Sequence, residues 1–170
     1  MHGVNIYQHC LHHQINQLVK TALVFFSTVD YIITGHLVDL RHGLVYLSLI
    51  GMAANYQERQ TFIEIDRERG HRKRLLNLLR QRATQLRIVD LVSILEGGSV
   101  GIAIYPIEWD KVQVLEHLSS YQSICYFGDK YLPGENDYRM ITDPRVTGFK
   151  VNSPEATIAS DVEKRPLVRS

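Results

Sequence analysis

Two aspartates that flank a short loop, Asp129 and Asp137, could bind a hard metal cation. The loop covers residues 128–137 and contains Pro133 and Gly134, a pair that interrupts regular structure and forces the chain to turn. Carboxylate oxygens are the ligands that Mg²⁺ takes from proteins, usually one or two of them together with waters and phosphate oxygens. Two acids held on one loop therefore predict a Mg²⁺ site.

The elements next to this loop are those expected at the ligand edge of an α/β sheet. The apolar run 124–127 predicts a buried strand of the parallel type directly before the loop. Open α/β sheets place ligand and metal groups at the carboxyl ends of their strands, which is where Asp129 falls. After the loop, Asn136 and Asp137 can cap a short helix expected over residues 136–141.

The pattern after residue 109 alternates between helix and strand. Asp110 can cap a helix that runs to about residue 120, and a strand is expected over residues 147–151. Ser153-Pro154-Glu155 is a typical helix start, because proline suits the first helical position and an acid suits the positive end of the helix dipole.

The N-terminal part predicts a compact antiparallel sheet with helices on one face. Apolar residues recur at spacings of three and four over residues 10–27 and 69–86, as on the buried side of amphipathic helices. The remaining pattern predicts two strand pairs. These are residues 36–40 with 44–49, joined by Arg41-His42-Gly43, and residues 88–95 with 100–105, joined by residues 96–99. Residues 55–65 are polar at first and then mixed, and they are assigned no element.

Composition and charge exclude several classes of protein. The 170 residues carry a net charge of +1, which gives no basic field for nucleic acid and no polybasic anchor for a membrane. The longest apolar stretch, residues 22–33, is too short to span a bilayer. Only Cys10 and Cys125 occur, so we expect a reducing compartment, and the N-terminus has no signal-peptide pattern. We therefore expect a cytoplasmic protein with no nucleic-acid or membrane partner.

Two other clusters could suggest different functions. His9 and His13 share a helical face near Cys10 and could begin a metal site, but no second pair of ligands is spaced to complete four-coordination. The basic run 67–74 could suggest nucleic-acid binding or nuclear import, but leucines recur beside it at helical spacing and the net charge is near zero. A surface helix is the favoured interpretation of each cluster.

A series of motifs, occurring in order, makes most of the chain similar to a known enzyme family. The motifs are Gly97-Gly98-Ser99, Tyr105-Pro106-Ile107-Glu108-Trp109-Asp110-Lys111, Tyr126-Phe127-Gly128-Asp129-Lys130, Pro133-Gly134-Glu135-Asn136-Asp137 and Thr142-Asp143-Pro144-Arg145. Together they resemble the eukaryotic-type phosphomannomutases, a branch of the haloacid dehalogenase superfamily. Upstream, residues 39–43, 50–51 and 57–59 resemble the cap domain of the same family.

The resemblance implies an α/β fold made of an α+β cap and a partial Rossmann-like core, a haloacid dehalogenase-like fold that lacks the N-terminal core strands. We expect the cap over residues 1–105, the C-terminal part of the core over residues 106–160 and a polar tail over residues 161–170. Half of a doubly wound core exposes a sheet edge, so we expect marginal stability, with the cap as the more stable part. Caps of this family dimerise, which implies a homodimer through the cap.

The family interconverts mannose 1-phosphate and mannose 6-phosphate with Mg²⁺ and an aspartate nucleophile, and so supplies GDP-mannose. The resemblance implies that Asp129 binds Mg²⁺, that Asp137 supports the site, and that Lys111 holds the phosphate and nucleophile charges together. It also implies a second cation loop over residues 141–146, built largely from backbone carbonyls. The residues of that loop implied as ligands are Ile141, Asp143 and Val146.

The resemblance assigns Arg41 and Arg59 to the non-reacting phosphate of the substrate, a task that suits the forked guanidinium. Three substrate-contacting positions depart from the family. Met52 stands where a third phosphate-binding arginine is expected, and Gly101 and Ala103 replace a serine and an aspartate that contact sugar hydroxyls. Losing one arginine–phosphate contact costs about 1.5–3 kcal/mol. We therefore do not expect tight, specific binding of mannose phosphates.

The family's nucleophile motif, Asp-x-Asp-Gly-Thr, is absent from this sequence, because no two of its aspartates are separated by a single residue. We therefore expect the chain to be inactive as a mutase on its own. The alternative is a degenerate, non-catalytic paralogue that keeps the cap as a dimerisation module. A related sugar-phosphate phosphatase would need the same missing nucleophile.

Overall fold

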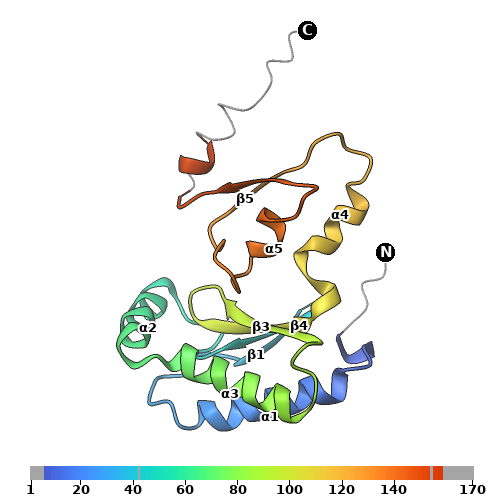
Figure 1. Ribbon diagram of the computed structural model, residues 1–170. Helices are drawn as coiled ribbons and strands as arrows, with labels where there is room; N and C mark the ends of the chain where they lie inside the picture. Colours follow the sequence, from blue (N-terminus) through green and yellow to red (C-terminus); the bar gives the residue numbers. More distant parts are fainter. Residues whose placement is uncertain (1–5, 42, 154, 159–170) are drawn as a thin grey trace. The chain divides into compact units, whose positions relative to one another are not determined.

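The computed structural model describes residues 6–41, 43–153 and 155–158 (Figure 1). The chain divides into two compact units, Met1–Asp110 and Lys111–Ser170. Each unit has its own sheet, with four strands in the first and two in the second. In these described residues, no helix combines the length and the apolar character that crossing a membrane requires.

A four-stranded antiparallel sheet forms the centre of the first unit, in the order β1-β2-β4-β3. Its strands are β1 (Val38–Arg41), β2 (Leu44–Ser48), β3 (Val92–Gly97) and β4 (Gly101–Pro106). One row across the sheet pairs Asp39 with Tyr46, Tyr46 with Ala103, and Ala103 with Leu95. The two predicted strand pairs are confirmed; His42, in the first predicted turn, lies outside the described residues.

The second strand pair begins later than expected. Residues 88–91 form a turn in which Ile88 accepts from the backbone N–H groups of Leu91 and Val92, at 2.9 and 3.2 Å. Arg87, just before this turn, has a φ of 58°, a left-handed conformation that ends the preceding helix. The prediction that the strand starts at residue 88 is therefore wrong, because these backbone groups are already bonded within the turn.

Two helices, α1 (His12–Phe26) and α3 (His71–Gln85), cover one face of the sheet (Figure 1). Their apolar residues recur every three or four positions, which places them on one side of each helix. That side packs on the strands, and the arrangement predicted from the sequence is confirmed. The shared core includes Ile15, Leu18, Ala22, Leu75, Leu79 and Ala83 from the helices and Val45, Leu47, Ile102 and Ile104 from the strands.

A third helix, α2 (Tyr56–Arg69), lies where the sequence suggested no element. A capping box begins it: the Asn55 side chain accepts from the Glu58 N–H at 2.9 Å, and the Glu58 carboxylate accepts from the Asn55 N–H at 2.7 Å. Gly70, with a φ of 62°, ends α2 and precedes α3. The helix predicted over residues 69–86 therefore begins at His71.

Asp66 links α2 to α3 across this glycine. Its Oδ1 accepts from the Arg72 backbone N–H at 2.8 Å, and its Oδ2 accepts from Arg72 Nε at 2.6 Å. Gly70 has no side chain with which to cap α3, so the buried Asp66 carboxylate satisfies that helix end instead. The Asp66 carboxylate thus stabilises the junction between α2 and α3.

The second unit contains a two-stranded parallel sheet, β5 (Cys125–Gly128) and β6 (Thr147–Lys150). Phe127 and Phe149 are paired in register, and their rings stack with centroids 4.8 Å apart. The parallel pairing is confirmed, but the prediction of a buried strand is wrong, since Cys125 is exposed and only Gly128 of β5 is buried. Among the described helices, the short α5 (Tyr138–Ile141) packs against both strands and leaves much of them accessible.

The helix predicted from Asp110 to residue 120 is short and irregular. It consists of a 3₁₀ turn, η3 (Lys111–Gln113), followed by α4 (Val114–His117), and residues 118–120 form a turn. Val112 and Val114 are β-branched and lower helix propensity at its start. The helix start predicted at Ser153 is present, since residues 155–158 are helical and Ser153 Oγ accepts from the Ala156 N–H at 3.2 Å.

Candidate functional site

Lys111, Tyr126 and Asp137 form a hydrogen-bonded cluster in the second unit. Lys111 Nζ donates to Asp137 Oδ1 at 2.6 Å, and the Tyr126 hydroxyl donates to the same oxygen at 2.7 Å. Lys111 Nζ also donates to Tyr126 Oη, at 3.4 Å. Lys111 lies in η3, Tyr126 in β5 and Asp137 at the end of the loop, so the fold gathers residues that are far apart in the sequence. The sequence indicated Lys111 and Asp137 as site residues but not Tyr126.

The loop over residues 128–137 fixes the position of the Asp137 carboxylate. The Asp137 N–H donates to the Lys130 carbonyl at 2.8 Å, and the Lys130 N–H donates to Asp137 Oδ2 at 3.2 Å. Gly128 lets the carboxylate approach the end of β5, because a Cβ there would lie 2.7 Å from Asp137 Cβ. The prediction that the Asp137 side chain caps the next helix is wrong. Its Oδ1 accepts from Lys111 and Tyr126, its Oδ2 accepts from the Lys130 N–H, and α5 has no side-chain cap.

The electrostatics of the cluster favour an ion pair. Burial lowers the pKa of Lys111, but hydrogen bonds to Asp137 and Tyr126 and the negative charge of Asp137 raise that pKa overall. Burial raises the pKa of Asp137, but hydrogen bonds from Lys111 and Tyr126 lower it overall. Burial and the hydrogen bond to Asp137 both raise the pKa of Tyr126. At neutral pH the lysine is therefore a cation, the aspartate an anion and the tyrosine uncharged.

This pair should stabilise the second unit within a window of pH. The folded pKa of Asp137 is lowered, so its contribution is present above the unfolded pKa of about 3.9 and is lost as pH falls through the folded value. The folded pKa of Lys111 is raised, so its contribution is present below the unfolded pKa of about 10.4 and is lost as pH rises through the folded value. Asp137→Asn should therefore lower the melting temperature at pH 7 and flatten the acid limb, as followed at β5 and β6 resonances by NMR.

Asp129→Asn provides the matched control for this prediction. Asp129 is exposed and makes no hydrogen bond or ion pair to another residue in the part of the chain that the structure describes. Removing its charge should leave the melting temperature and its acid limb unchanged. Equal effects of Asp129→Asn and Asp137→Asn would contradict a specific stabilising role of the Lys111–Asp137 pair.

An open cavity of about 430 Å³ lies beside the cluster. Both charge signs are represented in its wall, together with hydroxyl and amide groups that can donate to a polar ligand. The polar side chains that line it belong to Lys111, Tyr126, Asp129, Asp137, Asn152, Ser153 and Thr157. This lining suits a small, hydrophilic and charged ligand.

Asp129 is the acid at this cavity that has no partner among the described residues. Asp137 is already bound to Lys111, and the described residues contain no group of three His, Cys, Asp or Glu side chains placed to hold a metal ion. Mg²⁺ commonly takes one or two carboxylates and completes its shell with waters and phosphate oxygens. The described residues therefore fit one ligand of a Mg²⁺ shell and do not form a complete protein site.

The loop expected to form a second cation site, residues 141–146, is organised around an ion pair. Arg145 Nε donates to Asp143 Oδ1 and Arg145 Nη2 to Asp143 Oδ2, both at 2.9 Å, and these bonds lower the pKa of Asp143 to about 2. The Asp143 carbonyl accepts from the Val146 N–H at 3.0 Å. The Ile141 carbonyl faces Gly148, where a Cβ would collide with it. A cation at this loop would therefore have to use carbonyls rather than the engaged carboxylate.

The two arginines expected to bind phosphate are held by local acceptors in the first unit. Arg41 Nε, at the end of β1, donates to Asp39 Oδ2 at 2.7 Å. Arg59, in α2, donates through Nε to the Ala54 carbonyl at 2.8 Å and through Nη2 to the Met52 carbonyl at 3.1 Å. Met52 thus contributes a backbone oxygen that orients Arg59, and each guanidinium keeps further N–H groups that these bonds do not use.

Tyr46 is a residue near these arginines that the sequence interpretation missed. Burial raises the pKa of Tyr46, and the positive charges of Arg41, Arg59 and Arg72 act in the opposite direction. Glycines of β3 and β4 leave room for the ring of Tyr46, because a Cβ at Gly97 or at Gly101 would lie 3.0 or 2.6 Å from it. This closeness depends on the pairing of the strands.

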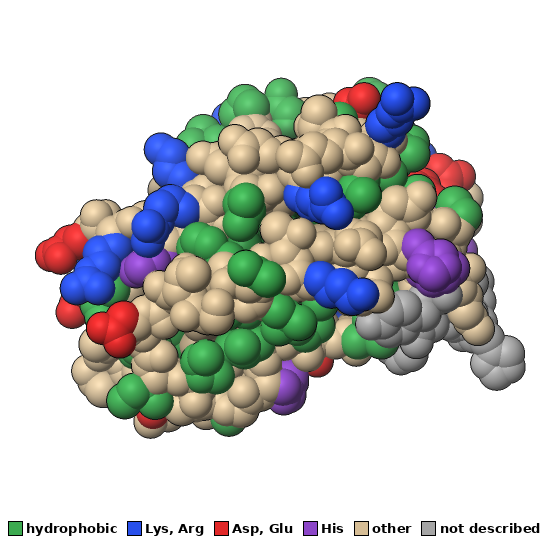
Figure 2. Space-filling view, turned by 90° about the horizontal axis from the view of Figure 1, so that it is seen from below, with side chains coloured by type: hydrophobic (Ala, Val, Ile, Leu, Met, Phe, Trp, Pro, Cys, Tyr) green, Lys and Arg blue, Asp and Glu red, His purple; other side chains and the backbone are tan. Residues whose placement is uncertain are grey.

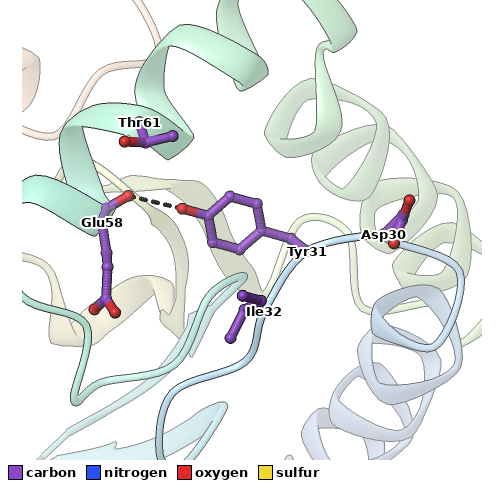
Figure 3. Close-up of a pocket in the computed structure, with 5 residues that line it drawn as sticks. All are labelled: Asp30, Tyr31, Ile32, Glu58 and Thr61. Carbon is purple, nitrogen blue, oxygen red and sulfur yellow. Dashed lines mark hydrogen bonds between the residues drawn. The ribbon is translucent and has the colours of Figure 1, made fainter.

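A second open cavity, of about 480 Å³, lies in the first unit (Figure 3). The Tyr31 hydroxyl donates to the Glu58 carbonyl at 2.9 Å, and the Tyr31 ring packs edge-on against Phe62 with centroids 5.5 Å apart. None of the site residues predicted from the sequence lines this cavity. Its lining is Asp30, Tyr31, Ile32, Glu58 and Thr61.

The histidines near the N-terminus do not share one helical face. His9 precedes α1, and its Nε2 lies 2.7 Å from Glu108 Oε1 while its ring packs edge-on against Trp109. The expectation that His9 and His13 lie on one helix is therefore wrong. The basic run 67–74 is likewise divided between α2 and α3 by Gly70.

Comparison with known proteins identifies relatives along nearly the whole chain. The family model described as eukaryotic phosphomannomutase matches residues 2–164. A probable phosphomannomutase of Caenorhabditis elegans is 32% identical over 146 residues, which are 85% of this chain and 56% of the relative. Phosphomannomutase 1 of Dictyostelium discoideum is 33% identical over 147 residues, which are 84% of this chain and 57% of the relative. The chain thus spans a little over half the length of these curated relatives.

Solved structures support the fold independently of the sequence matches. An N-terminally truncated, IMP-bound IMP-nucleotidase of Plasmodium falciparum aligns with a TM-score of 0.58 at 13% identity, over 90% of this chain and 37% of that one. At this identity the likeness concerns the fold alone, which is of the haloacid dehalogenase-like type. With the fold in agreement and the family match extending over residues 2–164, the chain belongs to the eukaryotic phosphomannomutase family.

Proposed function

We propose that this chain carries the phosphate-binding part of a phosphomannomutase-type site and does not interconvert mannose phosphates by itself. The observation that carries the proposal is the Lys111 ammonium, held 2.6 Å from Asp137 beside a cavity that Asp129 also lines. Membership of the family supports sugar phosphates as the ligand class and metal-dependent phosphoryl transfer as the associated chemistry. Mannose 1-phosphate and mannose 6-phosphate, on the route to GDP-mannose, are the substrates proposed.

Each residue of the cluster has a distinct task in this proposal. An ammonium has three N–H donors; Asp137 and Tyr126 take two from Lys111, and the third can meet a phosphate oxygen in the cavity. Asp137 keeps the ammonium in place and protonated. Asp129 is the residue that would hold Mg²⁺, whose charge, when it is bound, neutralises the transferring phosphoryl group. The carbonyls of residues 141–146 are the proposed ligands of a second cation.

The transfer step itself needs a nucleophile that these residues do not provide. No two aspartates in the sequence are separated by one residue, and the acids at the cavity are engaged by Lys111 or proposed as a metal ligand. We therefore expect that purified chain mixed with mannose 1-phosphate and Mg²⁺ produces no mannose 6-phosphate above the blank in ³¹P NMR. Mg²⁺-dependent conversion would overturn the non-catalytic part of the proposal.

Binding can be tested separately from turnover. Titration with mannose 1-phosphate should shift resonances around the cavity, and Lys111→Gln should weaken this binding about tenfold, as expected for a lost hydrogen bond to a charged group. Lys130→Gln is the control, because Lys130 is an exposed lysine on the same loop that contributes its backbone, not its ammonium, to the cluster. The absence of any resonance shift in the wild-type chain would contradict the proposed ligand class.

A degenerate, non-catalytic paralogue remains the second candidate. The first unit favours it, because Met52, Gly101 and Ala103 offer no polar side chain at three positions where the family is expected to contact substrate. In that case the first unit serves as a dimerisation module. Both candidates predict inactivity of the isolated chain. The titration with mannose 1-phosphate distinguishes them, because only the first candidate predicts binding at the cavity.

We further propose a homodimer through the first unit, in the cytosol. Figure 2 views the side on which Figure 1 draws α1 and α3, and hydrophobic side chains gather on that face. The exposed hydrophobic side chains of α1 and α3 include Leu23, Val24 and Leu78, and Val24 is 70% exposed. Exposed apolar surface of this kind favours association. The two free cysteines, Cys10 and Cys125, suit a reducing compartment.

Sedimentation equilibrium should therefore report a dimer that Val24→Glu weakens by at least about tenfold, because a charge would be buried in the contact. Gln57→Glu, which adds the same charge at an exposed position of α2, is the control and should leave association unchanged. A monomeric wild-type chain at all concentrations would contradict the proposal.

A further inference from the structure

The outer face of the four-stranded sheet, opposite α1 and α3, carries an arginine stacked on a tyrosine. The guanidinium carbon of Arg41 lies 4.8 Å from the centroid of the Tyr46 ring. Asp39 receives the Arg41 Nε–H at 2.7 Å, and Asp39 is paired in register with Tyr46. Arg41 is therefore held from two directions, by a carboxylate at Nε and by an aromatic ring against its flat side.

Tyr46 itself has little freedom to move. Its hydroxyl donates to the Gly97 carbonyl at 2.7 Å, and the residue is 8% exposed. Glycines leave the space that the ring fills: a Cβ at Gly101 would lie 2.6 Å from Tyr46 Cζ, and a Cβ at Gly97 would lie 3.0 Å from Cε2. The hydroxyl bond and the two glycines thus fix the ring, and the ring in turn limits the orientation of Arg41.

The terminal nitrogens of Arg41 remain available in this arrangement. Only Nε of Arg41 is hydrogen-bonded in the part of the chain that the structure describes. A guanidinium presents its terminal N–H groups as a planar fork that matches two oxygens of a phosphate.

We propose that Tyr46 is a positioning residue for an oxyanion site on this face, holding the Arg41 fork ready for a phosphate or a phosphate monoester. The proposal rests on the proposed function, which takes sugar phosphates as the ligand class, and on the resemblance that assigns Arg41 to a phosphate. It extends them to a residue that the sequence did not indicate. An arginine that is already ordered loses less conformational freedom when it binds a ligand. A cation–π contact at an accessible site corresponds to roughly a two- to fivefold change in an equilibrium constant.

Two substitutions separate positioning from simple structural support. Tyr46→Phe keeps the ring and removes the hydroxyl, so it should lower thermal stability but leave phosphate affinity at Arg41 within about twofold of wild type. Tyr46→Leu removes the ring, so it should weaken that affinity about two- to fivefold. Tyr31→Phe is the matched control, because Tyr31 also donates to a backbone carbonyl (Figure 3). Among the described residues, no guanidinium stacks on the Tyr31 ring. This control should lower thermal stability without changing the phosphate affinity at Arg41.

The experiment is an NMR titration of the full chain with inorganic phosphate, read at the Arg41 Nε–H resonance. In the wild type and in Tyr46→Phe, the Arg41 side-chain protons should also show an upfield ring-current shift that Tyr46→Leu abolishes. A response to phosphate that is equal in wild type and Tyr46→Leu would overturn the positioning role while leaving phosphate binding at Arg41 intact. No response at wild-type Arg41 would instead overturn the phosphate role of Arg41, and the oxyanion site with it.

Discussion

Alanine at position 51 is expected to destabilise the first unit severely. Gly51 has a φ of +88°, a conformation that strains any side chain, and a Cβ there would collide with the Thr34 carbonyl. That carbonyl cannot move easily, because it accepts from the Ala53 N–H at 3.1 Å while the Thr34 N–H donates to Ile50 at 2.8 Å. Backbone strain and overpacking together should cost about 2–5 kcal/mol in the free energy of unfolding, measured by urea denaturation.

Gly70→Ala separates the two contributions. Gly70 also has a positive φ, +62°, but nothing lies within 4 Å of a Cβ built there. Its replacement should therefore cost only the strain of the left-handed conformation, about 1–2 kcal/mol. If Gly51→Ala cost no more than Gly70→Ala, the close approach of the Thr34 carbonyl would not be the reason for glycine at position 51.

Removal of the Asp66 carboxylate should also have a large effect. Asp66→Ala leaves the first turn of α3 without its cap and leaves the Arg72 guanidinium, whose side chain is 18% exposed, without its closest partner. Breaking a buried pair from one side costs about 3–5 kcal/mol, and we expect the lower end of this range because Arg72 keeps some contact with water. Thermal and urea unfolding of the full chain would measure the loss.

The control uses the other partner of the same arginine. Arg72 Nη1 lies 3.3 Å from Glu96 Oε2, and the Glu96 side chain is 45% exposed. Surface ion pairs of this kind contribute about 0–1 kcal/mol, so Glu96→Ala should cost little. If the two variants lost comparable stability, the effect of Asp66→Ala would be explained by its ion pair with Arg72 alone, and the cap of α3 would contribute little.

The sheet of the first unit was predictable because its signals are local. Alternating apolar residues and turn glycines mark both strand pairs, and apolar spacing marks α1 and α3. Helix α2 was not predicted because it has no apolar stripe, since the residues that it buries are Phe62 and Asp66. Its signal was instead the capping box of Asn55 and Glu58, which precedes a polar sequence and is easily taken for a loop.

The site was predictable in its residue types but not in its bonds. Asp137 precedes a helix in the sequence, and local rules therefore favour a cap. The structure gives its carboxylate to Lys111, a partner 26 positions away, and such pairing follows from the fold of the whole unit. Tyr46 was missed for the same reason, since its role depends on the glycines of neighbouring strands. The mannose phosphate substrates and the homodimer through the first unit stay predictions.

The pairing of β5 with β6 has a consequence for handling the protein. Among the described residues these strands pair only with each other, so each has an outer edge whose backbone groups meet no further strand. Such an edge is a template for strands of other molecules, and β5 is rich in aromatic residues that would favour the contact. Association through these edges should therefore limit the solubility of the protein. Charged substitutions along the edges should raise that solubility.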